Sequence, residues 1–137
     1  LEMKKALLFF AAAALVVGVT AQLSIRAEIS VSESTFNEAN QVLYKEAVLA
    51  ASGAESGQIL ESSEAFYPGP ERKKRMVVHV EATLPSGTDA AQHIASLSAI
   101  NMAELINHKL HKAGATDLAG AVSGCLLGHN NQSHIVR

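Results

Sequence analysis

Two segments of the chain alternate between apolar and polar residues, strictly in the first and with Val77 as the exception in the second, and this pattern limits the fold more than any other feature. The first runs from Leu23 to Ser32, and the second runs from Met76 to Leu84. A period of two is typical of a strand with one buried face and one face in water. The chain is therefore expected to contain a sheet that is covered on one side only.

Helical patterns follow each of these strands. A capping box at Thr35–Glu38 predicts a helix that ends in the glycine-containing stretch Ser52–Gly57. A second, long helix is predicted from about Asp89 to Lys112. Its apolar stripe consists of Ile94, Leu97, Met102, Leu105, Ile106 and Leu110.

Two weaker strands complete the predicted order, at Gln58–Phe66 and Leu118–Leu127. The order β-α-β-β-α-β predicts an α+β fold of the ferredoxin-like type. This is a two-layer sandwich in which an antiparallel sheet carries both helices on one face. The first and third strands are expected to be central, because their alternation is the cleanest.

The N-terminal segment has the pattern of a secretory signal peptide. Lys4 and Lys5 precede an apolar run that is shorter than the roughly 20 residues a membrane-spanning helix needs. Small residues then predict cleavage between Ala21 and Gln22. We expect a signal-peptide helix at residues 1–21 and a secreted or cell-surface location, without a stable membrane span after cleavage. A retained anchor or filament-assembly helix is the alternative.

Composition limits the remaining classes. The chain has 137 residues, which suits one domain, and we place it at residues 22–127 with a polar tail at 128–137. The formal net charge of −2 gives no support for nucleic-acid binding. The single cysteine, Cys125, excludes an internal disulfide, and its apolar neighbours favour a buried thiol over an intermolecular disulfide.

The chain resembles the SEA-like, ferredoxin-like extracellular domains that are repeated in secreted and surface proteins of algae and other single-celled eukaryotes. The resemblance rests on the strand at Ser24–Val31, on Phe36–Ala39 at a helix start, and on a basic cluster before Met76–Val80. It implies a structural or adhesive module without enzymatic activity. Self-cleaving SEA domains carry Gly-Ser in the central hairpin, whereas this chain has Tyr67–Glu71 there. Self-cleavage is therefore not expected.

The basic cluster Arg72, Lys73, Lys74 and Arg75 is the most prominent local motif. Four adjacent charges favour a hydrated, exposed hairpin. The same residues match the pattern that furin-type proteases cleave, which predicts processing after Arg75 as one alternative. A contact with an anionic polysaccharide is another.

Three residues with metal-ligand chemistry, Glu104, His108 and His111, fall on one side of the second helix. A carboxylate and two imidazoles at this spacing are weak candidates for binding Zn²⁺ or Cu²⁺. Because no fourth ligand is evident, we interpret them as a solvated helix face, and we expect no metal and no other cofactor.

The remaining polar candidates lie on strands or in the tail. His79 and Glu81 should share the wet face with Arg26 and Glu28, which allows the cross-strand pairs Arg26–Glu81 and Glu28–His79. No nucleophile motif accompanies them, so no catalytic residues are assigned. Asn131 begins a sequon for N-glycosylation.

These patterns favour a secreted or cell-surface structural or adhesion module that binds other extracellular proteins or glycans. The alternatives are a domain that binds a small ligand or a metal, or a filament subunit that keeps its N-terminal apolar helix. The fold alone does not distinguish them.

Overall fold

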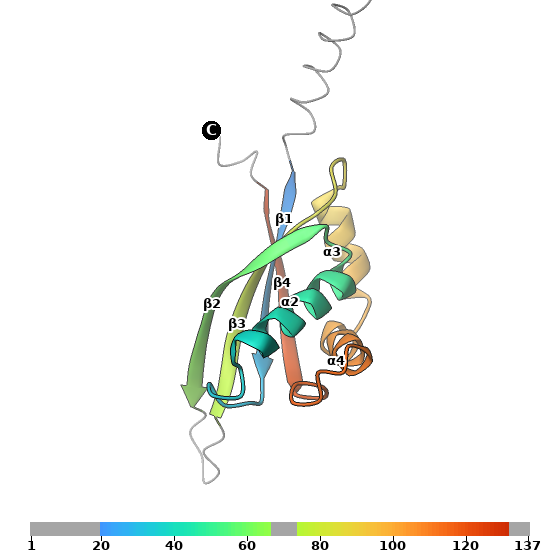
Figure 1. The fold of residues 1–137 in the computed structure, drawn as a ribbon. Coiled ribbons are helices and arrows are strands. Elements are labelled where there is room, and N and C mark those ends of the chain that lie inside the picture. The colour runs from blue at the N-terminus through green and yellow to red at the C-terminus, as the bar shows by residue number, and fades with distance from the viewer. Residues whose placement is uncertain (1–19, 67–73, 132–137) are drawn as a thin grey trace, which may run out of the picture.

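The computed structural model describes residues 20–66 and 74–131. These residues form an α+β fold with a four-stranded antiparallel sheet and three helices (Figure 1). The elements in chain order are β1 (Ala21–Ile29), α2 (Glu38–Ser52), β2 (Ser56–Phe66), β3 (Lys74–Thr83), α3 (Ala90–Ser98), α4 (Met102–Lys112) and β4 (Val122–Asn131).

The strands lie in the order β2-β3-β1-β4, and every neighbouring pair is antiparallel. The two strands with clean alternation, β1 and β3, are the central ones, as predicted. Their register places Ile25 opposite Val80 and Arg26 opposite His79. Apolar residues therefore share one face of the sheet and polar residues share the other.

The three helices cover the apolar face of the sheet (Figure 1). The core lies between these layers, and its largest fully buried side chains include Phe36, Tyr44, Leu23, Ile25, Ile29, Leu84, Ile106 and Leu110. The rings of Phe36 and Tyr44 meet edge to face, with centroids 5.7 Å apart. Phe36 is in the core, as expected from its place at the start of the first helix.

The prediction of a single helix from Asp89 to Lys112 is wrong, because the segment forms α3 and α4. The helix divides because Leu97 and Met102, which both belong to the apolar stripe, are five residues apart. Residues at that spacing cannot lie on the same face of one continuous helix. Asn101 stands between them and caps α4, where its Oδ1 accepts a hydrogen bond from the Glu104 backbone N–H at 3.1 Å. Three helices, not two, therefore cover the sheet.

Further boundaries differ from the prediction, and the last strand begins at Val122 rather than Leu118. The cap of α2 is Asn37 rather than Thr35, and its Oδ1 accepts from the Asn40 backbone N–H at 3.0 Å. The helix ends at Gly53, which takes the left-handed conformation with φ 72°, inside the predicted stretch. The last strand continues to Asn131, so the predicted polar tail begins within β4.

The predicted signal peptide lies outside the described residues except for Thr20 and Ala21. Ala21 already belongs to β1, and its carbonyl accepts a hydrogen bond from the Leu84 backbone N–H at 2.9 Å. The predicted cleavage before Gln22 therefore falls at the start of the first strand. Within residues 20–66 and 74–131, none of the helices has the length and apolar character needed to cross a membrane.

Candidate functional site

The face of the sheet opposite the helices, here called the open face, carries side chains from all four strands. Strand pairing aligns them in three rows, each written from β2 to β4. The rows are Gln58, Glu81, Ser24 and Gly128; then Glu61, His79, Arg26 and Leu126; then Ser63, Val77, Glu28 and Gly124. Acidic, basic and apolar groups thus lie side by side on one surface.

Two polar contacts connect β1 to β3 on the open face. Ser24 Oγ lies 2.7 Å from His79 Nε2, and the Arg75 guanidinium donates to Glu28 Oε2 at 3.2 Å. The predicted pairs Arg26–Glu81 and Glu28–His79 do not form. Ser24 contacts His79, which lies two residues before its direct partner Glu81, and Glu28 contacts Arg75, which lies two residues before its direct partner Val77. Both predicted pairs instead joined a β1 residue to the β3 residue two places after its direct partner. Strand twist makes the two diagonals unequal, which alternation alone does not reveal.

A shallow hollow of about 410 Å³ lies on the open face between β1 and β4. Its lining includes Arg26, Glu28, Val77, Gly124 and Leu126. The hollow exists partly because Gly124 has no side chain, and a Cβ built at this position would meet nothing within 4 Å.

Two side chains at this hollow are prominent for their exposure. Leu126 is 69 % exposed, more than any other large apolar side chain in the described part of the chain. Arg26 is exposed, and no hydrogen bond or ion pair within the described part of the chain engages its guanidinium. The site therefore offers a hydrated cation beside an apolar surface.

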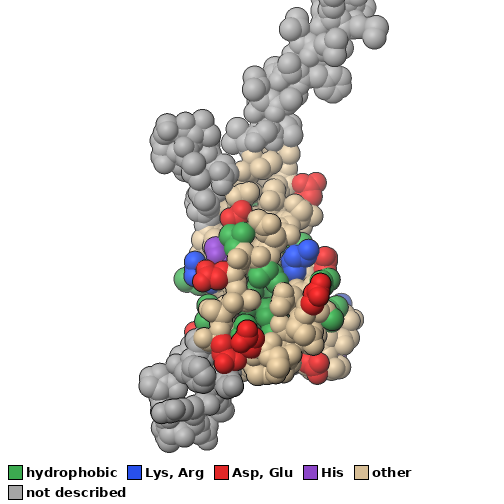
Figure 2. Space-filling view, turned by 60° about the vertical axis from the view of Figure 1, so that its left-hand side comes forward, with side chains coloured by type: hydrophobic (Ala, Val, Ile, Leu, Met, Phe, Trp, Pro, Cys, Tyr) green, Lys and Arg blue, Asp and Glu red, His purple; other side chains and the backbone are tan. Residues whose placement is uncertain are grey.

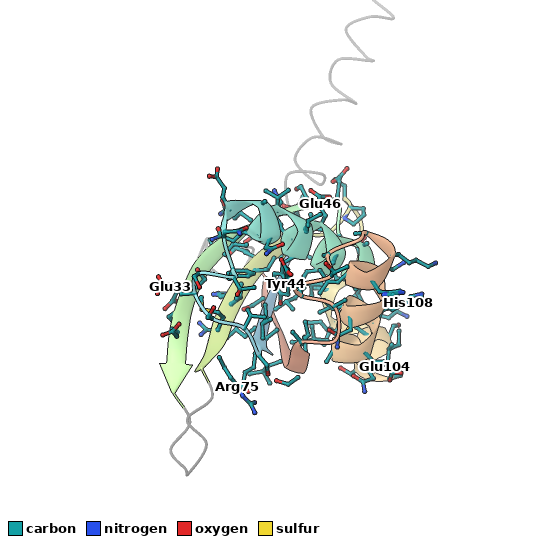
Figure 3. All side chains as sticks on the ribbon, turned by 60° about the horizontal axis from the view of Figure 1, so that its bottom comes forward. Glu33, Tyr44, Glu46, Arg75, Glu104 and His108 are labelled. Carbon is teal, nitrogen blue, oxygen red and sulfur yellow. The ribbon has the colours of Figure 1, made fainter. Side chains whose placement is uncertain are left out.

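The predicted metal candidates are on the opposite layer. Glu104 and His108 point away from the sheet on the outer side of α4 (Figure 3), and His111 is exposed on the same helix. A hollow beside α4 is lined by Glu104 and His108 but not by His111. In the part of the chain that the structure describes, no group of three or more such residues is placed to hold a metal ion.

The basic cluster is only partly described, because Arg72 and Lys73 fall outside the described residues. Lys74 begins β3, and Arg75 is a half-buried strand residue paired with Glu28 (Figure 3). The prediction of an exposed hairpin is therefore wrong for Arg75. The predicted processing bond, between Arg75 and Met76, lies inside β3, where β1 and β2 flank it through Ile29 and Glu64. Cleavage there requires the pairing of β3 with its two neighbours to open around this bond.

Cys125 is half-buried and faces the helices, opposite Ala27 of β1. Burial raises the pKa of its thiol to about 11, which keeps it protonated and unreactive at neutral pH. Tyr44 is fully buried, and both this burial and the charge of a Cys125 thiolate raise the pKa of its phenol. The sequon residue Asn131 ends β4 opposite Ala21.

Sequence reasoning missed two polar residues with structural consequences, Ser24 and Asn107. Alternation predicts that Ser24 lies on the wet face of the sheet, but it does not predict the contact with His79, which depends on strand twist. The Asn107 side chain bonds both backbone groups of Val122, at 2.9 and 3.0 Å, and so joins α4 to the start of β4. A polar residue next to the apolar stripe of a helix was the only signal for this second role.

No known family model matches the chain, and a search of curated proteins finds no match either. What the protein does must therefore be inferred from its fold and its surface.

Proposed function

We propose that the protein is a secreted or cell-surface structural and adhesion module without enzymatic activity, and that it binds extracellular partners through the open face. The observation that carries this proposal is the hollow beside Arg26 and Leu126. The exposed leucine gains free energy when a partner covers it, and the neighbouring guanidinium must then be paired with an anion, so the site suits a partner that presents a carboxylate beside an apolar group. Extracellular proteins and uronic-acid glycans both offer that combination.

We further propose that the fold is of the ferredoxin-like type, as in SEA-like extracellular domains. The strand order β2-β3-β1-β4 with antiparallel neighbours supports this topology. The division of the second helical segment into α3 and α4 is a local variation that leaves the strand order unchanged. Folds of this kind display one uncovered sheet face, which is available for binding.

The Ser24–His79 contact has the atoms of a nucleophile and its base, but we assign it a structural role. Such a pair needs a third group that orients the other imidazole nitrogen. Glu61 lies opposite His79 in the ladder, yet no hydrogen bond between described residues connects them. The contact instead ties the central strands together on their wet side.

The proposal is tested on the cells that produce the protein. Sequencing the N-terminus of the released protein should give a chain that starts at Gln22. The released protein, fluorescently labelled, should then bind the surface of the same cells, and Arg26→Glu should abolish that binding because it repels a carboxylate.

The matched control is Lys112→Glu, which makes the same charge reversal at an exposed position at the end of α4. Binding should survive this change. A chain that stays inside the cell, or surface binding that Arg26→Glu leaves intact, would overturn the proposed location or the proposed surface, respectively.

A further inference from the structure

The β2 edge of the sheet is protected against pairing with another strand, whereas the β4 edge is not. The β2 edge has acidic residues at Glu61 and Glu64 and a register irregularity between Ile59 and Glu61. Figure 2 shows the side that carries β2, where acidic side chains surround a small apolar patch. Charges and bulges are the usual devices that protect an edge strand. From Val122 to Gly128, β4 has no charged residue and no proline.

The hydrogen-bonding pattern shows which groups of β4 face outward. The Leu84 N–H bonds to Ala21 O, and the Ser30 N–H bonds to Ala121 O. Because bonding alternates along an antiparallel strand, the even-numbered residues of β1 bond to β4. Their β4 partners are Gly124, Leu126 and Gly128. The backbone N–H and C=O groups of Cys125 and Leu127 therefore point to the outer edge.

The uncovered part of the outer β4 edge begins after Val122. The backbone groups of Val122 are satisfied by the Asn107 side chain. Beyond that residue, no strand lies along β4 on the side away from β1 among residues 20–66 and 74–131. Unpaired groups along a long, neutral strand form a template for another strand.

We propose that a second copy of this chain occupies the β4 edge, pairing antiparallel with β4 around a two-fold axis at Cys125. In that register, Leu126 of each copy lies directly opposite Gly124 of the other. The exposed leucine would then fill the hollow of about 410 Å³ that Gly124 leaves open, and symmetry makes this contact twice. This self-complementarity favours a second copy over an unrelated strand.

The helix side of the same edge supports this occupant. A groove of about 410 Å³ runs between β4 and the α3–α4 junction, and its lining includes Leu97, Met102 and the 48 % exposed Ile100. A strand added to β4 would bring its own Cys125 and Leu127 beneath this junction. The neutral strip also lets two copies, each with a formal net charge of −2, approach without local repulsion. The acidic β2 edge would repel its own copy.

The experiment uses two full-length copies of the chain, each with a different epitope tag, produced in the same cells. Capture of one tag should recover the other. Leu126→Asp should lower the recovery at least about tenfold, because pairing would bury an unpaired charge. Gly124→Leu should lower it similarly, since the new side chain would occupy the hollow of its own copy, and a Cβ at this position meets nothing within 4 Å.

The matched control is Leu60→Asp, an exposed leucine at 47 % on the protected β2 edge, which should leave recovery unchanged. Circular dichroism and thermal unfolding of the variants should match the parent protein, because both substituted sites are exposed or open. Absence of recovery for the parent chain would overturn the proposal. Recovery that survives both Leu126→Asp and Gly124→Leu would also overturn it, and would assign association to another part of the chain. In the pair, Leu126 of the second copy would occupy the hollow that we propose to bind extracellular partners, so the two proposals describe a paired and a single chain. Capture between copies tests the first and cell-surface binding with Arg26→Glu tests the second, and each can fail without the other.

Discussion

The two faces of the sheet are made from the same strands, yet they are under different constraints. Ile25 on the covered face is fully buried, whereas its neighbour Arg26 on the open face is exposed. On the covered face, burial of apolar area determines which residue types fit. On the open face, individual contacts such as Ser24–His79 compete with water and contribute little. The comparison shows that stability is concentrated on one face, which leaves the residues of the other face freer to vary.

The largest expected effect is a difference in the free energy of unfolding between substitutions of Ile25 and Arg26. Ile25→Ala should lower the free energy of unfolding by about 2–5 kcal/mol, because it leaves a cavity between the sheet and the helices. Arg26→Ala should change it by less than about 0.5 kcal/mol. Urea unfolding of both variants measures the difference. Equal losses would show that the open face is not the solvated surface described above.

The next effect concerns the joint between the helical layer and the sheet. Asn107→Ala should cost about 2 kcal/mol, because both backbone groups of the buried Val122 lose their partner. Asn107→Asp keeps the acceptor for the Val122 N–H and should cost less. Thermal unfolding of the two variants checks the order. If alanine is tolerated as well as aspartate, the side chain is not what fixes the start of β4.

A smaller effect is expected for the ion pair on the open face. A double-mutant cycle with Glu28→Gln and Arg75→Gln should give a coupling of about 0.2–1 kcal/mol, because both partners are in contact with water. The coupling should fall further at high salt. A coupling of several kcal/mol would mean that the pair is shielded from solvent, which would contradict the view of this face as open.

The last effect is absent at neutral pH, appears only at alkaline pH, and comes from the covered face. The pKa of the Cys125 thiol is about 11 in the fold and 9.0 for the free group. Between these values the unfolded chain releases the proton while the folded chain keeps it, so stability should fall as pH rises through this range. The loss is absent below pH 9, where both states are protonated. Burial of Tyr44 adds a loss of the same sign, which begins near pH 10, the ordinary pKa of the phenol, and continues to higher pH.

Urea unfolding under reducing conditions from neutral to alkaline pH measures this dependence. Cys125→Ala should remove the part of the loss that belongs to the thiol and leave the rest. A thiol that is alkylated with a midpoint near the ordinary value would show that Cys125 is not protected by the fold.

Much of the architecture could be predicted because it follows from period and composition. The alternation of β1 and β3, which only Val77 interrupts, identified the central strands and assigned their residues to the two faces. The glycine-containing stretch after α2 located the end of that helix. The break between α3 and α4 was readable in principle, since Asn101 followed by Glu104 is a capping signal and the stripe loses its phase there. The break was missed because residues on both sides of it favour a helix, so the segment from Asp89 to Lys112 was predicted as one helix.

Patterns within single segments are enough to assign the strand faces, the helix-covered core and the neutral character of β4. In contrast, the contact of Ser24 with His79, the bonding of Asn107 to Val122 and the position of Leu126 beside Gly124 arise only when the chain is folded. Such contacts join residues far apart in the chain, and their geometry follows from strand twist, register and the angle at which helices cross the sheet. Those quantities arise only when the layers pack together, so no local pattern contains them.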